Sequence, residues 1–146
     1  MIENLNKESI FTAAGVIGAF IASLFGGWTS GMTTLVIMMA VDYIMGILVA
    51  AVFGKSKKTE DGKLESRAGW KGLVRKGTTL LIVLVATRID MLIGTNFVRD
   101  AAVIGFAANE LLSIVENAGL MGVPMPAAIT NAVEVLQNKA TEDNKE

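Results

Sequence analysis

Four long apolar segments, separated by glycine-rich or charged stretches, dominate the hydropathy pattern of the chain. They cover about residues 10–28, 32–53, 78–94 and 98–115. A helix needs roughly 20 residues to cross about 30 Å of hydrocarbon, and the first two segments meet that length. The pattern therefore predicts an all-α, polytopic membrane protein with three to four transmembrane helices in a single domain, residues 1–146.

The fourth segment allows two interpretations. It is about 15 to 18 residues long and carries Asn109 and Glu110 near its centre. Such a segment fits a fourth transmembrane helix, and it equally fits a helix that is buried among the others or lies in the membrane interface. Four spans would leave both termini on one side of the membrane, whereas three would separate them.

A C-terminal tail, residues 116–146, follows the last apolar segment. Its ENAGLMG stretch is typical of a helix end, and the sequence predicts a break at Gly122 to Pro124. A short amphipathic helix is expected after the break, either on the membrane surface or packed on the protein. Apolar residues at helical spacing carry this expectation: Ile129, Ala132, Val133 and Leu136.

Composition narrows the class of protein. The chain is 52% hydrophobic with a mean hydropathy of +0.52, above the apolar share of an ordinary soluble domain. Cysteine and histidine are both absent, which excludes disulfides, thiol nucleophiles, thiolate metal sites and histidine general bases. We therefore expect no enzyme activity, no cofactor and no metal site.

A basic segment, residues 54–77, separates the second and third apolar segments. Its eight bases against three acids give a net charge of +5. An excess of Lys and Arg in a short loop between spans marks the cytoplasmic side. The stretch from Ser66 onward is also compatible with a short interfacial helix leading into the third span. Nucleic-acid binding is not expected, because the flanking spans account for the charges. The bases are Lys55, Lys57, Lys58, Lys63, Arg67, Lys71, Arg75 and Lys76.

Small residues recur at four-residue spacing on the first apolar segment. Such stripes allow transmembrane helices to approach closely, although ordinary small-residue content explains them equally well. The candidate packing residues are Gly15, Gly18, Ala19 and Ala22, with Gly46 in the second segment.

Four charged residues lie inside the apolar segments: Asp42, Arg88, Asp90 and Glu110. A charge at the bilayer centre costs about 2.5–3.5 kcal/mol on insertion scales, so each needs a partner or water. Asp42 and Arg88 each lie about 17 Å from the basic loop, which predicts an Asp42–Arg88 pair, with Asp90 as a further partner. Glu110 takes the remaining partner or stays protonated. Structural pairing is the first interpretation, followed by pore lining and then a proton relay.

Several blocks in a fixed order give the chain a family resemblance. They are VDYIMGILVA at Val41 to Ala50, GWKGLVRK at Gly69 to Lys76, an apolar helix with Asp90 near its end, and ANELLSIVENAGLMGVPMP ending at Pro126. Over roughly Asp42 to Leu136 the chain resembles the toxin secretion/phage lysis holin family. Arg88 departs from that family's pattern, so the resemblance assigns it no role.

The resemblance implies a multi-pass holin of the bacterial cytoplasmic membrane. Such a protein self-associates and opens pores or lesions that release an endolysin, with the lipid bilayer as its surroundings and no necessary contact with the endolysin. Two other functions stay open from the residues: a small ion or proton channel or carrier that uses Asp42 and Glu110, and a membrane scaffold. The intramembrane polar set common to these hypotheses is Asp42, Arg88, Asp90, Asn109 and Glu110.

Overall fold

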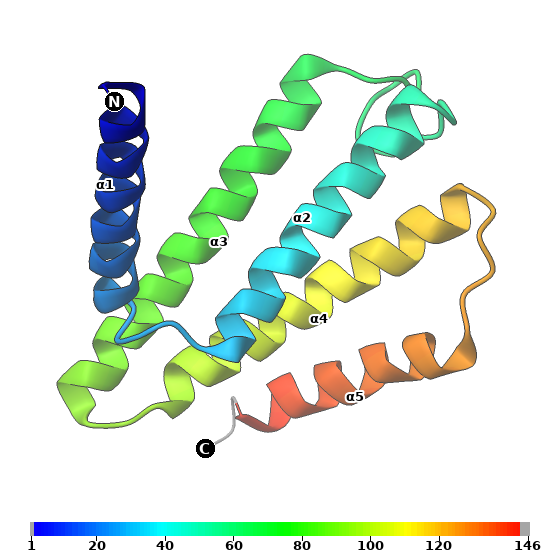
Figure 1. Ribbon diagram of the computed structural model, residues 1–146. Helices are drawn as coiled ribbons and strands as arrows, with labels where there is room; N and C mark the ends of the chain where they lie inside the picture. Colours follow the sequence, from blue (N-terminus) through cyan, green and yellow to red (C-terminus); the bar gives the residue numbers. More distant parts are fainter. Residues whose placement is uncertain (1, 144–146) are drawn as a thin grey trace.

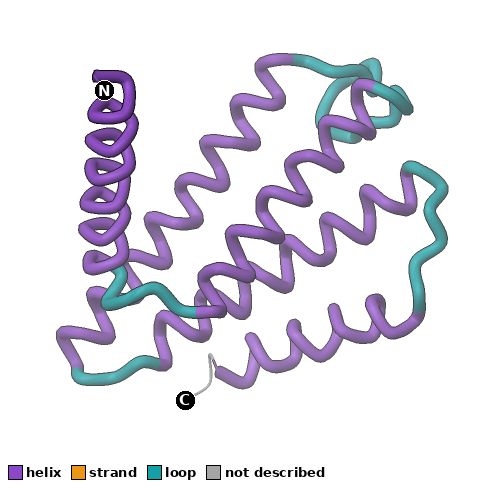
Figure 2. Tube along the Cα trace, viewed as in Figure 1, coloured by secondary structure: helices purple, strands orange, loops and turns teal. Residues whose placement is uncertain are grey.

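Five α-helices and no strand make up residues 2–143, the part of the chain that the computed structural model describes (Figures 1 and 2). The predicted all-α class is confirmed. Three helices, α2, α3 and α4, form a bundle, α5 lies along α4, and α1 stands apart from the others (Figure 1). The helix bounds are α1 Ile2–Leu24, α2 Ser30–Ala51, α3 Ser66–Ile93, α4 Phe97–Leu120 and α5 Ala127–Asp143.

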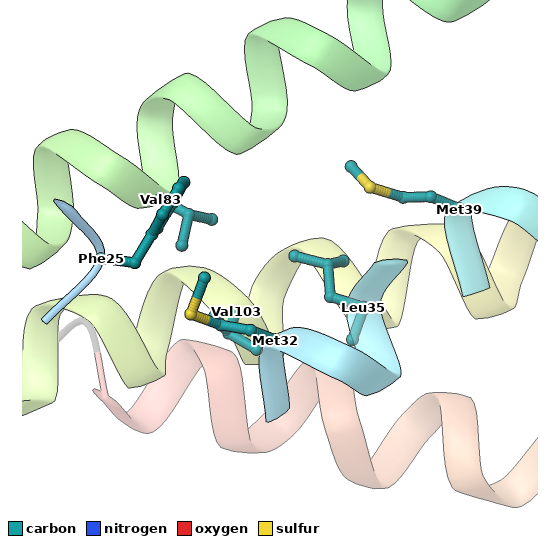
Figure 3. Close-up of a cluster of buried hydrophobic side chains, with 7 residues drawn as sticks. Phe25, Met32, Leu35, Met39, Val83 and Val103 are labelled. Carbon is teal, nitrogen blue, oxygen red and sulfur yellow. The ribbon is translucent and has the colours of Figure 1, made fainter. Parts of the chain in front are cut away.

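The bundle runs up, down and up, and its apolar core lies near the link between α1 and α2. Side chains from α2, α3 and α4 converge there together with one residue of the link (Figure 3). Leu35 and Val83 are almost wholly buried. This core fixes the three helices against one another at the end opposite to the α2–α3 loop. Its members are Phe25, Met32, Leu35, Met39, Val83, Val103 and Ala107.

The first helix makes no extended contact with the rest of the described chain. It ends earlier than the predicted span, at Leu24, because Gly26 and Gly27 adopt positive φ angles of 67° and 97° that terminate a right-handed helix. A Cβ at Gly26 would lie 2.8 Å from the Met91 side chain. The link is therefore seated on α3 even though α1 itself is not.

The second helix begins at Ser30, two residues before the predicted span, because Thr29 caps it. The Thr29 hydroxyl accepts a hydrogen bond from the Met32 backbone N–H at 3.2 Å. By length and hydropathy two helical segments suit a membrane crossing, Asn6–Leu24 and Ser30–Ala51. No other helix among residues 2–143 meets both criteria.

The third helix corrects the predicted loop. The predicted loop, residues 54–77, ends at Glu65, and α3 is one continuous helix from Ser66 to Ile93, which confirms the alternative of a helix that starts at Ser66 and leads into the third span. Four of the eight bases, from Arg67 to Lys76, therefore lie on a helix. The sequence from 66 to 77 contains no proline, and its Arg and Lys residues are good helix formers, so the helix runs into the apolar segment although Gly69, Gly72 and Gly77 are poor helix formers. Gly94, with φ 74°, ends α3 as a left-handed cap.

The fourth helix is longer than predicted, since it continues through the ENAG stretch to Leu120 instead of ending near residue 115. The predicted break is confirmed: residues 121–126 are not helical, and Gly122 has a φ of 77°. The predicted amphipathic helix is α5. It packs antiparallel on α4, because the Cβ of Ala140, near its end, lies 3.8 Å from the Cβ position of Gly105, near the start of α4.

Candidate functional site

A cluster of three charged side chains joins the three bundle helices. Lys76 of α3 lies between two carboxylates: its Nζ is 2.7 Å from Oδ2 of Asp42 on α2 and 2.5 Å from Oε2 of Glu110 on α4. None of the three side chains is more than 15% exposed. Two carboxylates therefore share one ammonium group inside the bundle, with a formal net charge of −1.

Two neutral side chains of α4 complete the cluster. Ser113 donates its hydroxyl to Asp42 Oδ1 at 2.5 Å, and Asn117 donates its side-chain N–H to the same oxygen at 2.9 Å. Glu110, Ser113 and Asn117 follow one another at spacings of three and four residues, so they form one polar stripe on a helix face. Both oxygens of the buried Asp42 are satisfied, which offsets much of the cost of burying its charge.

A cavity of about 100 Å³ adjoins the cluster on the side of the α2–α3 loop. Asp42, Lys76 and Asn117 line its inner end, and Lys57 and Lys58 of the loop line the other. Gly46, which we expected to pack helices closely, borders this cavity. The nearest atom to its Cβ position is Lys58 Nζ, 4.0 Å away. The glycine therefore leaves space between α2 and the loop instead of bringing two helices together.

The loop over the cavity has a defined conformation. Ser56 donates its backbone N–H to Gly62 at 2.9 Å, and Thr59 donates its hydroxyl to the Lys63 carbonyl at 2.9 Å. A Cβ at Gly62 would lie against the Gly54 carbonyl, so the two ends of the loop approach closely. Seven of the eight basic residues in the segment 54–77 are exposed, both in the loop and on α3. These are Lys55, Lys57, Lys58, Lys63, Arg67, Lys71 and Arg75.

The predicted Asp42–Arg88 pair is wrong, because Lys76 is the partner of Asp42. The error follows from the start of α3. Since that helix begins at Ser66, the residue at the depth of Asp42 lies ten residues into it, and that residue is Lys76. Arg88 lies 12 residues further along, about 18 Å away. It is exposed, and its guanidinium donates to the Met91 sulfur at 3.4 Å.

Asp90, also expected to share that pair, has a different position and role. It is 3% exposed, and it accepts hydrogen bonds from the backbone N–H groups of Val98 at 3.1 Å and Arg99 at 2.8 Å. The Thr95 hydroxyl donates to it at 2.6 Å. Asn96, at the N-cap position of α4, makes no side-chain cap. Asp90 therefore satisfies the N–H groups that an N-cap side chain ordinarily serves.

Other predicted residues lie apart from the cluster. Asn109 is exposed and borders an open groove between α3, α4 and α5. On α1, no side chain comes within 4 Å of the Cβ positions of Gly15 and Gly18, and Ala19 is exposed. Ala22 is half-buried near the end of the helix. Close helix packing by this stripe stays a prediction, for contacts between copies of the chain.

Sequence reasoning missed Lys76 as a cluster member and missed Ser113 and Asn117 altogether. Lys76 was assigned to the loop because it belongs to the basic segment. The polar stripe was visible, however, since Glu110, Ser113 and Asn117 recur at helical spacing within an apolar segment.

The bundle and its cluster lie within a region that matches a known family. A model of the bacteriophage holin family matches residues 19–138, which include the end of α1, the whole bundle and most of α5. The chain belongs to the bacteriophage holin family. This family membership and the two helices suited to a membrane crossing indicate a membrane-associated holin.

Relatives from phages and bacteria resemble this holin over most of their length. A probable holin of Bacillus phage phi105 is 36% identical over 118 residues, 80% of this chain and 81% of its own. An uncharacterised protein of Listeria monocytogenes is 35% identical over 129 residues, 88% of this chain and 86% of its own. An uncharacterised protein of Clostridium perfringens is 33% identical over 125 residues, 84% and 89% of the two chains. No solved structure matches this holin.

Proposed function

We propose that this holin accumulates as a multi-pass protein in the bacterial cytoplasmic membrane, self-associates and opens lesions that release an endolysin to the cell wall. The family match over residues 19–138 is the observation that carries the proposal, because it covers the whole helical bundle. The related probable holin of Bacillus phage phi105 supports a role in phage lysis. The endolysin uses the lesion and need not bind the holin.

In this proposal α1 to α4 are the four membrane-spanning helices. The 28 residues of α3 and the 24 of α4 exceed the length needed to cross the hydrocarbon, which is roughly 20 residues. The charges of Asp42, Lys76 and Glu110 are acceptable because the single lysine pairs with both carboxylates inside the bundle, away from lipid. The basic α2–α3 loop then faces the cytoplasm, as an excess of Lys and Arg favours.

The ion cluster supplies a physical basis for opening the membrane. Its polar groups are stable only where a partner or water satisfies them. In the single chain the partners come from three helices, and the cavity beside the cluster extends toward the loop. When copies associate, the same groups are able to line a water-filled lesion without facing lipid.

Inducible expression with a cytoplasmic muralytic enzyme that lacks a secretion signal tests this function. We expect growth to continue for a period after induction, then to stop abruptly with loss of membrane potential and lysis of the culture. The enzyme alone should leave the cells intact, and the chain alone should stop growth without lysis. Full accumulation in the membrane with preserved potential and no lysis would refute the proposal.

A small ion or proton carrier is the second candidate, favoured by one observation. Asp42 and Glu110 share a single lysine next to a cavity, an arrangement compatible with proton exchange. A carrier passes ions but no macromolecule, so it should change the membrane potential or internal pH without releasing the muralytic enzyme. Release of the enzyme therefore separates the two functions.

A further inference from the structure

The helix α5 presents a polar surface along the outside of the bundle. Val133 is buried against the bundle, and Ala132, Leu136 and Ala140 are half-buried beside it. Apart from Ala127, Ala128, Ile129 and Val135, the exposed residues of α5 are polar. Its described charged and amide side chains are Asn131, Glu134, Gln137, Asn138, Lys139 and Glu142.

The direction of α5 places these polar groups at the depth of the membrane. The helices α2 and α4 run in the same direction, since Val103 packs near Met32 and Asn117 contacts Asp42. The C-terminal end of α4 therefore lies at the level of the basic loop, and α5 runs back from there toward the opposite end (Figure 1). Its 17 residues extend about 25 Å, most of the hydrocarbon thickness.

Such a surface does not belong against lipid. Glu134 and Lys139 lie about 10 and 18 Å along α5 from its start, where a lipid-facing charge is most costly. Neither side chain has an ion-pair partner among the described residues. If α4 crosses the membrane, α5 must either face water within the membrane or leave α4.

The charge of α5 argues against a helix that leaves α4 to lie on the inner leaflet. Interfacial helices are rich in Lys and Arg, which the anionic lipids of that leaflet attract. The described side chains of α5 include two acids, Glu134 and Glu142, and one base, Lys139. Its apolar face is also small, since it consists of Ile129, Ala132, Val133, Leu136 and Ala140, two of which are alanines.

We propose that α5 stays on α4 in the open lesion and that its polar surface, centred on Glu134 and Asn138, lines the water-filled lumen between copies of the chain. The proposal rests on the proposed holin function. The amide and carboxylate groups would then face water, while the outer faces of α1 and α3, with exposed residues such as Phe11 and Leu81, face lipid or neighbouring copies.

The absence of cysteine permits a direct test. The Gly105 Cβ position lies 3.8 Å from the Ala140 Cβ, a separation that suits a disulfide. The double variant Gly105→Cys with Ala140→Cys should therefore link α5 to α4 when oxidised. Purified full-length protein is placed in liposomes that contain a fluorescent dextran of endolysin size, and dextran release is compared before and after reduction. The single variants, oxidised in the same way, are the controls.

We expect the oxidised, linked protein to release dextran within about twofold of the reduced protein, because α5 need not move. Release that falls at least tenfold on oxidation and returns on reduction would overturn the proposal and show that α5 leaves α4. No release by the unsubstituted chain would refute the holin function itself, and this inference with it.

Thiol labelling provides the second measurement, in case the linked protein folds poorly. In open lesions a membrane-impermeant maleimide should label Asn138→Cys at least tenfold faster than Leu81→Cys, which lies on the outer face of α3 and is 61% exposed. Equal, slow labelling of both cysteines during dextran release would overturn the assignment of α5 to the lumen.

Discussion

Asp42 and Asp90 are equally buried, at 4% and 3% exposure, yet the protein accommodates them in opposite ways. Asp42 binds side chains from two other helices, including a lysine, and so links three helices. Asp90 binds backbone N–H groups and one hydroxyl within nine residues of the same chain. Asp42 therefore holds the three bundle helices together at the candidate functional site, whereas Asp90 stabilises the turn between α3 and α4.

The largest expected effect comes from removing Lys76, the cation that pairs with Asp42. Lys76→Met leaves Asp42 and Glu110 close together without a counter-charge, and removing one partner of a buried pair costs about 3–5 kcal/mol. We expect unfolding in detergent at a much lower temperature and loss of lysis with the co-expressed muralytic enzyme. Lys71→Met, an exposed residue of the same helix, is the control and should behave as the parent. Normal stability of Lys76→Met would remove the distinction between the two aspartates.

Next in size is the difference between the two carboxylates of the cluster. Asp42→Asn weakens contacts to Lys76, Ser113 and Asn117, so we expect a loss of about 2 kcal/mol in the free energy of unfolding. Glu110→Gln weakens the contact to Lys76 alone and should cost about 1 kcal/mol. Denaturant titration in micelles measures both values. A larger loss from Glu110→Gln would mean that Asp42 is not the centre of the cluster.

The turn site should respond more weakly. Asp90→Ala removes the acceptor for two N–H groups at the start of α4, and loss of a helix cap costs about 0.5–2 kcal/mol. We expect less holin in the membrane, as measured by immunoblot, and a delay in lysis that this smaller amount fully explains. Asp100→Ala, which removes an exposed acid from the first turn of α4, is the control. Complete loss of lysis at normal membrane levels would give Asp90 a functional role.

The smallest effect is expected at Arg88. It is exposed and about 7 Å from the end of α3, close enough for its long side chain to reach the interface. Arg88→Gln should change the free energy of unfolding by no more than about 0.5 kcal/mol and leave the lysis time unchanged. A loss as large as that of Lys76→Met would restore Arg88 as a partner in the bundle.

The sequence predicts the helices better than their pairing. Apolar runs located α1 to α4, because burial in lipid or protein imposes long apolar segments, and the glycine and proline residues from Gly122 to Pro124 located the break before α5. The predicted depth of each charge depends on where the third helix begins. A start at residue 78 places Arg88 at the depth of Asp42, whereas the actual start at Ser66 places Lys76 there.

The role of Asp90 could not be predicted from hydropathy at all. It depends on the turn at Gly94 and Thr95, which folds the start of α4 back onto the carboxylate. Only the three-dimensional path of that turn brings the N–H groups of Val98 and Arg99 to the side chain. Asp42 and Asp90 therefore looked alike in sequence although their environments differ.

A double-mutant cycle between Asp42 and Lys76 tests the central claim most directly. The free energy of unfolding in micelles is measured for Asp42→Asn, Lys76→Met and the double variant, with a parallel cycle of Asp42→Asn and Arg88→Gln. We predict a coupling of at least about 1 kcal/mol for Asp42 with Lys76 and additive effects for Asp42 with Arg88. Additivity in the first cycle and coupling in the second would contradict the account.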